Sequence, residues 1–467
     1  MNNKYDLAII GAGPGGYVAA IRAAQLRKRV VLIEKEKLGG TCMNCGCIPT
    51  KYLLHETEIY KGLKENKNVE IGGVLSLNWK RTQEEKKRIV QRLIKGIDFL
   101  LKKNWVEVIK GKGILEQDRK VVVYSKEGKK VLEAEKIILA TGSRPAEFSF
   151  LRPNGKKVIT SEEALDLEYI PKEMLIIGAG AIGLEIGSIF QRVGCKVSIL
   201  EIMPTILPGS DNEIVSRLEK ILKRQGLNIY TKMRIEECRH LNGKVSLKGI
   251  SLDSNTPFEF QSEMVLMAAG RRPNSEFIVE NTDIYMDKGK YVKVNQTLET
   301  SVKGVYAIGD LIGGKLLAHK ASHEGIVAAE NSSGITGIKR EMNYKALPSA
   351  VYTYPEFSSV GITEEEARKK GMKVQVGVFS LQANGRALTM GSSEGLAKII
   401  AGERDEIIGA HILSPNASEL IAELTLAVEN EMTLKDVSSC THIHPTLSEA
   451  VMEAAMNAKK EAIHTIN

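Results

Sequence analysis

Short apolar runs recur along the N-terminal two thirds of the chain and predict buried strands. Two of these runs, at residues 6–10 and 173–177, lead directly into glycine-rich turns, and a helical pattern follows each turn. Similar runs at 136–139 and 305–308 predict further buried strands. Strands that alternate with helices in this way are typical of an α/β fold built on parallel sheets.

Two other patterns break this alternation. Apolar residues between Gln83 and Lys103 recur at helical spacing, which predicts an amphipathic helix packed in a core or against another subunit. Alternating residues near Val121–Tyr124 predict a small antiparallel sheet. After about Met342 the pattern changes, and we expect a separate α+β domain there. Its expected strands and helices are Ala350–Tyr352, Ala397–Ile400, Ala417–Asn430 and Leu447–Lys459.

The chain contains an internal repeat. Residues 6–16 read DLAIIGAGPGG, and residues 173–183 read EMLIIGAGAIG. In each copy a second apolar strand ends in an acid, Glu34 or Glu201, 18 residues after the third glycine. In such a unit the first glycine permits a tight turn, the second lets the backbone approach a pyrophosphate, and the third lets helix and strand pack closely. The acid accepts a hydrogen bond from a ribose hydroxyl, so two dinucleotide-binding units are predicted.

Composition excludes several other classes of protein. The chain has 467 residues, 43% of them hydrophobic and 26% charged, which fits a globular protein of several domains. Its net charge of +8 is not gathered into basic blocks and aromatics are only 5%, so we expect a solvated surface and no nucleic-acid partner. There is no signal-peptide pattern and no apolar run near the ~18 residues of a membrane span. We therefore expect a cytoplasmic protein without a membrane span.

Three of the six cysteines lie in one segment, at Cys42, Cys45 and Cys47, and the others are scattered. This is not a disulfide framework. A disulfide between Cys42 and Cys47 in a reducing cytosol is expected to be catalytic. Beside a nucleotide-binding unit, it suggests electron transfer between a cofactor and sulfur. The three thiolates could instead bind a metal together with His442 and His444, but no fourth ligand has convincing spacing, so no metal site is expected.

Several further motifs accompany the fingerprints and the cysteines. They are IPTK at 48–51, ATG at 140–142, GRRPN at 270–274, IGD at 308–310, LAH at 317–319 and HIHPTLSE at 442–449. With these motifs the chain resembles the flavoprotein disulfide reductases over nearly its whole length, and among them most closely the dihydrolipoamide dehydrogenases. The resemblance implies two Rossmann-like domains, for FAD and NAD, and a C-terminal α+β dimerisation domain. The expected boundaries are 1–145 and 270–342 for the two parts of the FAD-binding domain, 146–269 for the NAD-binding domain and 343–467 for the dimerisation domain.

The resemblance also implies the cofactor-binding residues. At the FAD, the glycines approach the pyrophosphate, Glu34 holds the adenosine ribose, Gly113 contacts adenine and Asp310 binds the sugar-alcohol chain. The FAD set is Gly11, Gly13, Gly16, Glu34, Thr41, Lys51, Gly113, Thr141, Gly142, Ser143, Asp310, Leu317, Ala318 and His319. The NAD set is Gly178, Gly180, Ile182, Gly183, Glu185, Glu201, Ile235 and Gly270. Glu201 would repel a 2′-phosphate, and no arginine follows it at 202–207, which favours NAD over NADP. The structural alternatives are a helix cap for Asp310 and a surface helix charge for Glu185.

The catalytic residues are carried over in the same way. Cys47 matches the sulfur next to the flavin and Cys42 the sulfur that exchanges with substrate, while Pro49 suggests a helix that begins nearby. His444 would reach across a dimer interface as the base, with Glu449 orienting its ring, and its bond to Pro445 would be cis. Lys51 and Glu185 would form an ion pair beside the flavin.

The expected reaction is the NAD-dependent oxidation of protein-bound dihydrolipoamide by a homodimer. Its partners would be lipoyl-bearing proteins of 2-oxo acid dehydrogenase or glycine cleavage complexes. The alternatives are an NADH-dependent reductase of another disulfide, a polysulfide or a metal ion, and a non-catalytic FAD-binding subunit. Two positions depart from the family pattern. Cys45 is either a bystander or the partner of Cys42 in an off-pathway disulfide, and Tyr354 stands where many relatives carry His or Asp.

Overall fold

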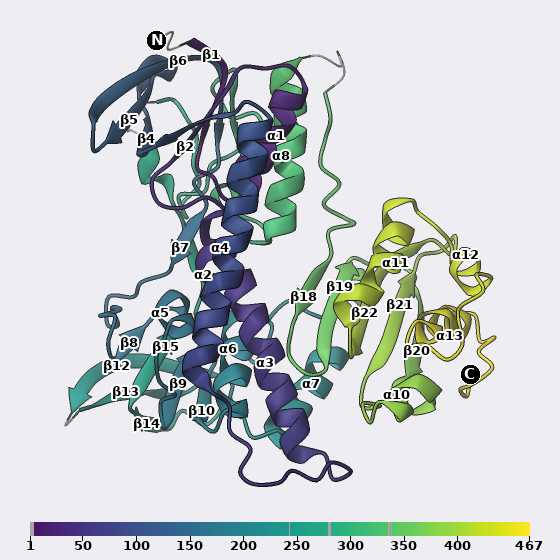
Figure 1. The fold of residues 1–467 in the computed structure, drawn as a ribbon. Coiled ribbons are helices and arrows are strands. Elements are labelled where there is room, and N and C mark those ends of the chain that lie inside the picture. The colour runs from purple at the N-terminus through teal and green to yellow at the C-terminus, as the bar shows by residue number, and fades with distance from the viewer. Residues whose placement is uncertain (1–3, 242, 279–281, 335–336, 338) are drawn as a thin grey trace. The chain divides into compact units, whose positions relative to one another are not determined.

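The computed structural model describes residues 4–241, 243–278, 282–334, 337 and 339–467. The chain packs into two compact units (Figure 1). Unit 1 comprises residues 1–53, 78–146 and 270–342, and unit 2 comprises residues 54–77, 147–269 and 343–467. None of the helices in the described residues combines the length and apolar character that a membrane crossing needs.

Unit 1 is built on a sheet with the strand order β3-β2-β1-β6-β5-β4, and β17 pairs with β6. The strands β3, β2, β1, β6 and β17 are parallel, while β4 and β5 extend the sheet as an antiparallel meander with β6. The strands are β1 (Lys4–Ile10), β2 (Val30–Glu34), β3 (Glu107–Lys110), β4 (Lys112–Leu115), β5 (Val121–Ser125), β6 (Gly128–Leu139) and β17 (Val305–Ala307). A short ribbon of β7 (Ser143–Pro145) and β16 (Arg271–Pro273) completes the unit's strands among the described residues.

Helices of unit 1 pack beside each other on this sheet. Helix α1 (Pro14–Gln25) lies along α8 (Ala318–Ser333), and α4 (Trp79–Lys103) also contacts α1 (Figure 1). The apolar faces of β1, β2 and these helices form one hydrophobic cluster, and the opposite face of the sheet forms a second. The short α2 (Gly40–Cys45) follows β2, and α3 (Cys47–Glu65) leads from unit 1 into unit 2.

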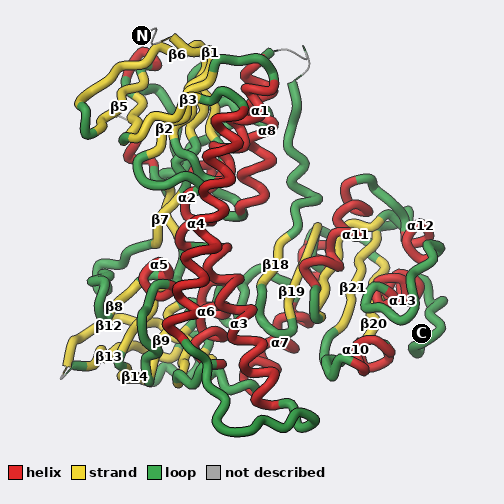
Figure 2. Tube along the Cα trace, in the orientation of Figure 1, coloured by secondary structure: helices red, strands yellow, loops and turns green. Residues whose placement is uncertain are grey.

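Unit 2 contains a second parallel sheet, in the order β11-β10-β9-β15-β8. Its strands are β8 (Val158–Ile159), β9 (Glu173–Ile177), β10 (Lys196–Leu200), β11 (Asn228–Tyr230) and β15 (Met264–Met267). Its helices are α5 (Ser161–Leu165), α6 (Ala181–Arg192) and α7 (Asn212–Arg224). An antiparallel sheet of β12 (Met233–Leu241), β13 (Lys244–Ser251) and β14 (Pro257–Ser262) adjoins it (Figure 2).

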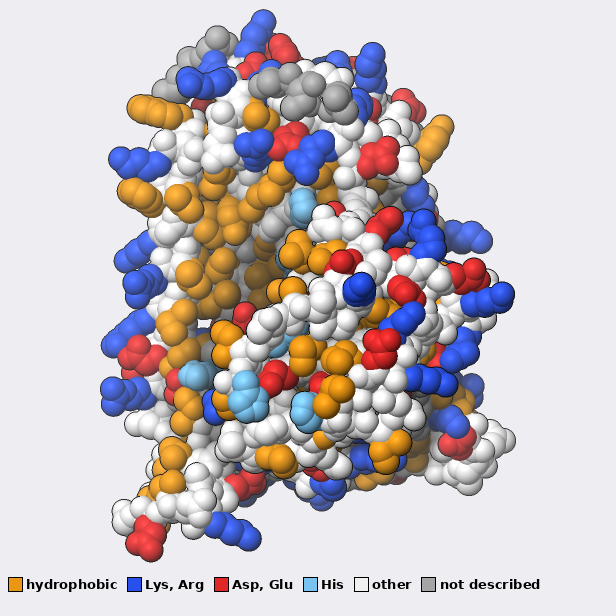
Figure 3. Space-filling model, turned by 90° about the vertical axis from the view of Figure 1, so that its right-hand side faces the viewer, with side chains coloured by type: hydrophobic (Ala, Val, Ile, Leu, Met, Phe, Trp, Pro, Cys, Tyr) orange, Lys and Arg blue, Asp and Glu red, His pale blue; other side chains and the backbone are white. Residues whose placement is uncertain are grey.

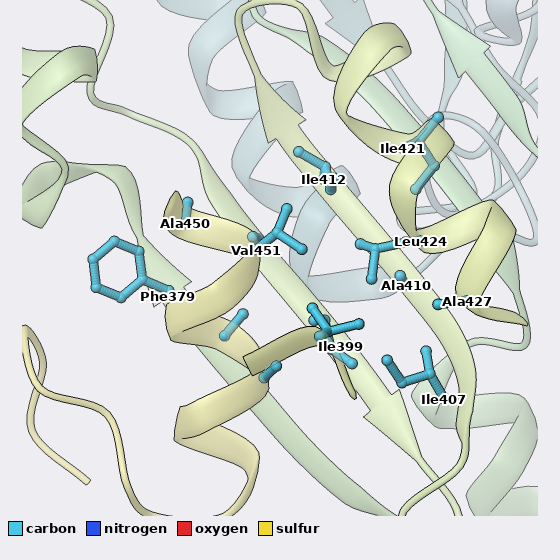
Figure 4. Packing of buried hydrophobic residues seen from close by; sticks show 14 of the residues in the cluster. Phe379, Ile399, Ile407, Ala410, Ile412, Ile421, Leu424, Ala427, Ala450 and Val451 are labelled. Atoms are coloured by element: carbon cyan, nitrogen blue, oxygen red, sulfur yellow. The ribbon is translucent and has the colours of Figure 1, made fainter. Parts of the chain in front are cut away.

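The C-terminal part of unit 2 is an antiparallel sheet covered by helices. The sheet has the order β18-β19-β22-β21-β20. Its strands are β18 (Ser349–Val351), β19 (Glu356–Gly361), β20 (Gln375–Ser380), β21 (Leu396–Ala401) and β22 (Ile407–Ser414). The helices are α9 (Glu364–Lys369), α10 (Gly385–Thr389), α11 (Ala417–Glu429), α12 (Leu434–Ser438) and α13 (Glu449–Ala458). Figure 4 shows how Ile399, Ile412, Leu424 and Val451 from strands and helices pack into one core.

This architecture confirms the predicted fold class. Both copies of the repeat form strand, helix and strand: β1, α1 and β2 in unit 1, and β9, α6 and β10 in unit 2. The amphipathic helix is present, and the segment after Met342 is α+β as expected. The bounds of the four predicted segments remain predictions.

Candidate active site

The two glycine-rich turns have the same geometry, each within its own unit. The first glycine of each turn has a positive φ, +103° at Gly11 and +102° at Gly178, which residues with a side chain rarely adopt. A Cβ at the third glycine would lie 1.8 Å from the Gly11 carbonyl oxygen in unit 1, or 2.0 Å from that of Gly178 in unit 2. The third positions, Gly16 and Gly183, must therefore be glycine for the helix to pack against the turn.

The second glycine of each turn is different, because it faces open space. A Cβ at Gly13 or Gly180 would meet nothing within 4 Å. Each of these glycines is the N-cap residue of its helix and has an extended backbone. No side chain caps the helix at this position. Each turn therefore leaves free room beside the backbone N–H groups of a helix N-terminus, which is the arrangement that a pyrophosphate requires.

The acids at the ends of the second strands hold these turns. Glu34 accepts a hydrogen bond from the Ala12 backbone N–H at 2.8 Å, and Glu201 accepts one from the Ala179 N–H at 2.7 Å. The other oxygen of each carboxylate accepts from the backbone two residues further on. A carboxylate oxygen can accept more than one hydrogen bond, so both acids retain capacity for a ribose hydroxyl. The sequence predicted that these two acids bind a ribose, but it did not predict that they also fix the glycine turns.

The redox segment lies in unit 1 directly after the first fingerprint. Cys42 and Thr41 are in α2, and Cys47 is the first residue of α3, which confirms the helix expected near Pro49. The Cys42 and Cys47 thiols are hydrogen-bonded to each other. That hydrogen bond, followed by burial, raises the pKa of the Cys42 thiol far above its ordinary value, although the charge of Lys51 opposes the shift. The two thiols therefore interact directly, as a redox pair requires.

A second group of predicted flavin residues is joined by hydrogen bonds in unit 1. The Ser143 hydroxyl donates to the Asp310 carboxylate at 2.5 Å, and Arg271 Nε donates to the Ser143 hydroxyl at 2.7 Å. The Thr141 hydroxyl donates to the Asn274 carbonyl oxygen, and the Asn274 amide donates back to the Thr141 carbonyl oxygen at 2.9 Å. These bonds tie the turn after β6 to the segment after β16. Gly142, between them, has a φ of +69° and open space at its Cβ position.

Other predicted FAD residues lie at the ends of elements in unit 1. Leu317 caps α8 without a side-chain hydrogen bond, and Ala318 and His319 form the first turn of that helix. Asp310 lies in a short 3₁₀ turn after β17. Gly113 is in β4, where a Cβ would come within 3.1 Å of side chains from both β1 and β2, so its lack of a side chain also serves packing.

The residues predicted to bind the nicotinamide dinucleotide are spread over several elements. Glu185 is buried in α6, and its Oε1 accepts a hydrogen bond from the Tyr352 backbone N–H at 3.0 Å. Ile182 precedes Gly183 in the same helix. Ile235 is in β12 next to a register shift, and Gly270 has a φ of +108° with open space around it. The expected pairing of Lys51 with Glu185 joins residues of different units and stays a prediction.

The predicted base and its partner lie together in unit 2. His444 Nδ1 is 2.9 Å from Glu449 Oε1, and the Thr446 backbone N–H donates to Glu449 Oε2 at 2.8 Å. Burial favours a higher pKa for Glu449, but these hydrogen bonds outweigh it and leave the pKa below the ordinary value. The His444 side chain is 79% exposed. The His444–Pro445 bond is cis, as expected, and so is Tyr354–Pro355.

The neighbouring His442 has a different role. Its Nε2 is 3.0 Å from Glu423 and its Nδ1 is 3.0 Å from the Cys440 carbonyl oxygen. Within the described ranges, no group of three or more His, Cys, Asp or Glu side chains is placed to hold a metal ion.

Sequence reasoning assigned no role to several residues that the structure places at this site. Arg271 and Asn274 were noticed only as part of a motif, although they hold Ser143 and Thr141. Tyr17 in α1 lies close enough to Cys42 for a negative charge on that sulfur to add to the effect of burial in raising the tyrosine pKa. None of these roles follows a local sequence pattern.

The residues present fit the two expected cofactors. The open second glycine of each turn provides the cradle for one dinucleotide in each unit. In unit 1 the Cys42–Cys47 pair follows that cradle in the chain, and α2 begins after Gly39, whose N–H donates to the Ala12 carbonyl oxygen of the turn. A dinucleotide with a redox-active ring fits unit 1, and a nicotinamide dinucleotide fits unit 2.

Comparison with known proteins defines the family. The model described as pyridine nucleotide-disulphide oxidoreductase matches residues 5–325, and the model of that family's dimerisation domain matches residues 347–455. The chain belongs to the pyridine nucleotide-disulphide oxidoreductase family.

Individual relatives and solved structures are similar to the chain over nearly its whole length. Dihydrolipoyl dehydrogenase of Thermus scotoductus is 42% identical over 99% of both chains. That of Bacillus subtilis is 40% identical over 99% of this chain and all of its own. Among solved structures, the HOCl-induced flavoprotein disulfide reductase RclA from Escherichia coli has a TM-score of 0.85 at 26% identity, covering 97% of this chain and 99% of its own. LpdA from Mycobacterium tuberculosis, at 23% identity over 96% of this chain and 98% of its own, shares the fold with a TM-score of 0.87.

These findings confirm the predicted family and enzyme class. The protein is an oxidoreductase of the type that includes the dihydrolipoyl dehydrogenases, which use FAD and NAD(H). The individual site residues stay predictions that the geometry above supports.

Proposed function

We propose that this protein oxidises protein-bound dihydrolipoamide to lipoamide with NAD⁺, as an FAD-containing homodimer. The observation that carries the proposal is the pair of hydrogen-bonded thiols, Cys42 and Cys47, directly after a dinucleotide cradle and at the start of a helix. Full-length identity of about 40% to dihydrolipoyl dehydrogenases supports this substrate class. Lipoyl-bearing proteins of 2-oxo acid dehydrogenase or glycine cleavage complexes are the proposed partners, and a reducing compartment such as the cytoplasm is the proposed location.

The thiol exchange uses residues of this chain. One substrate thiolate attacks the Cys42 sulfur of the oxidised enzyme, so that the Cys42–Cys47 bond breaks and Cys47 leaves with the electron pair. The second substrate thiol loses its proton to His444 and displaces Cys42, which closes the lipoamide disulfide. The hydrogen bond between the Cys42 and Cys47 thiols supports this exchange, because it places the two sulfurs next to each other.

Other residues prepare the groups that react. Glu449 orients the imidazole of His444 through Nδ1, which leaves Nε2 to accept the substrate proton. The FAD, when bound, supplies a carrier for the electron pair between the reduced thiols and NAD⁺. Glu201 and the second glycine turn, which the Ala179 N–H joins, would hold the NAD⁺ in unit 2. Glu185 is fixed by the Tyr352 N–H.

The experiment is a steady-state assay of the purified protein. NADH formation from dihydrolipoamide and NAD⁺ should be rapid, and replacement of NAD⁺ by NADP⁺ should lower kcat/KM by at least about tenfold, because Glu201 repels a 2′-phosphate. Glutathione disulfide, polysulfide and Cu²⁺ with NADH serve as competing substrates. A higher kcat/KM for any of these than for lipoamide would replace the proposal with a reductase of that substrate.

A further inference from the structure

Helix α8 contains an ion pair that is buried in unit 1. Lys320 Nζ is 3.1 Å from Glu324 Oε1, one helical turn away, and the two side chains are 3% and 0% exposed. Two charges removed from water carry a large desolvation cost, which an ion pair alone often fails to offset. The other contacts of this pair therefore matter for its role.

The pair holds both backbone polar groups of Gly309. The Gly309 N–H donates to Glu324 Oε2 at 2.7 Å, and Lys320 Nζ donates to the Gly309 carbonyl oxygen at 3.2 Å. These groups belong to the peptides before and after the Gly309 Cα, so the two bonds fix both of its dihedral angles. Gly309 has a φ of +73° and is buried at the start of the 3₁₀ turn after β17. An apolar pair of similar size would pack as well but would leave the N–H and C=O of Gly309 without these partners.

The residue after Gly309 is Asp310, the expected ligand of the flavin's sugar-alcohol chain. Its carboxylate accepts from the Ser143 hydroxyl, and Arg271 Nε lies 3.9 Å from it. Asp310 is thus held at its side chain by the turn after β6 and at its backbone by α8. The same helix begins with Ala318 and His319, which directly precede Lys320 and belong to the expected FAD set.

We propose that Lys320 and Glu324 are positioning residues that fix Asp310 relative to the first turn of α8 for FAD binding. This inference rests on the proposed function, because it assumes that FAD occupies unit 1. Neither side chain is proposed to touch the cofactor. Their effect is transmitted through the Gly309 backbone.

The experiment compares the holoenzyme with three variants. Lys320→Met removes the donor to the Gly309 carbonyl oxygen, and the milder Glu324→Gln keeps size and an acceptor but removes the charge. Lys398→Met is the matched control, because Lys398 is 2% exposed and pairs with Asp211 at 3.0 Å in unit 2. The readouts are the rate of FAD release in mild chaotrope, followed by free-flavin fluorescence, the visible circular dichroism of the bound flavin, and the denaturation midpoint of the apoprotein.

The expected result is specific to FAD. Misplacing one charged hydrogen-bond acceptor should speed FAD release by about 10- to 100-fold in Lys320→Met, and by less in Glu324→Gln. Both variants should also alter the flavin dichroism. Lys398→Met should lower the denaturation midpoint while its FAD release and dichroism match the wild type.

Several outcomes would overturn the inference or its basis. If the α8 variants lose stability but release FAD at the wild-type rate, the pair is only structural and the inference is wrong. If Lys398→Met speeds FAD release equally, general destabilisation explains the effect. If Lys320→Met does not fold, Glu324→Gln decides between these outcomes. A wild-type protein that holds no FAD at all would instead refute the proposed function.

Discussion

At the scale of single residues, the segment with Cys42, Cys45 and Cys47 contains the predicted redox pair. Cys42 and Cys47 are hydrogen-bonded to each other, and Lys51 is near enough to favour a thiolate on Cys42. Cys45 is the last residue of α2. Whether Cys45 is a bystander or pairs with Cys42 in an off-pathway disulfide stays a prediction, which spectroscopy can test.

We expect Cys47→Ser to abolish the long-wavelength thiolate–flavin absorbance that appears on anaerobic titration with dihydrolipoamide. Loss of the sulfur next to the flavin removes the electron donor of that band. Cys45→Ser is the matched control and should keep both the band and the turnover rate. A band that disappears in Cys45→Ser would show that this third thiol belongs to the redox machinery.

At the scale of elements, α1 and α8 cross at small residues. A Cβ at Gly325 of α8 would lie 2.4 Å from the Gly15 carbonyl oxygen of α1. The contact is backbone against backbone, so neither side can give way by a rotamer change. Arg22 of α1 and Arg340 then bind the same carboxylate, that of the buried Glu330 in α8, at 2.7 and 2.6 Å.

Gly325→Ala should therefore lower the free energy of unfolding by about 1–3 kcal/mol, measured by chemical denaturation. Gly96→Ala is the control, because Gly96 is in the middle of α4 and a Cβ there meets nothing within 4 Å. That substitution should be neutral or stabilise by up to about 1 kcal/mol through helix propensity. Equal effects of the two substitutions would contradict the close crossing of α1 and α8.

The ion pairs of Glu330 with Arg22 and Arg340 predict that the stability of the protein depends on pH. Burial favours a higher pKa for Glu330, but its hydrogen bonds to Arg340 and Arg22 outweigh it and leave the pKa below the ordinary 4.5. The stabilising contribution of the carboxylate is thus complete above pH 4.5 and is lost as the pH falls towards the folded-state pKa. Glu330→Gln should cost about 1–2 kcal/mol at neutral pH, because both arginines are partly exposed, and less below pH 4.5. Denaturation curves at several pH values would measure this difference, and a constant difference would contradict it.

At the scale of the whole molecule, the exposed His444 points to an assembly. Its neighbour in the chain, Ile443, is 78% exposed, so an apolar side chain reaches the surface beside it. Leu426 of α11 is 61% exposed as well. Figure 3 shows that hydrophobic side chains and histidines reach the surface of the molecule. The match of residues 347–455 to a dimerisation domain supports burial of this segment against a second copy.

Subunit mixing tests whether the site is shared between chains. The homodimers of Cys47→Ser and of His444→Gln should each be inactive. If they are unfolded together and refolded as an equal mixture, half of the dimers should combine one chain of each kind. Each mixed dimer then has one site with both native residues, so about a quarter of the wild-type activity should return. No recovery, with dimers verified by sedimentation, would place Cys47 and His444 of the same chain in one site.

Particular residues show how far prediction from the sequence reached. The helix expected from Gln83 begins at Trp79, because the Asn78 side chain caps it by accepting from the Arg81 N–H. The helix expected from Leu447 begins at Glu449, and the hydroxyls of Thr446 and Ser448 are hydrogen-bonded to each other just ahead of it. Such ends depend on individual side chains, whereas the helices themselves follow from apolar periodicity.

The sequence by itself determined the repeated glycine turns, the cysteine pair and the alternation of strand and helix, since these depend on residues close together in the chain. Only the tertiary structure decided that Ser143 and Asp310, 167 residues apart, share a hydrogen bond, and that Lys320 and Glu324 hold the Gly309 backbone. Such pairings leave no local pattern, because they form only where sheet packing brings distant polar groups together and excludes the water that would otherwise satisfy them.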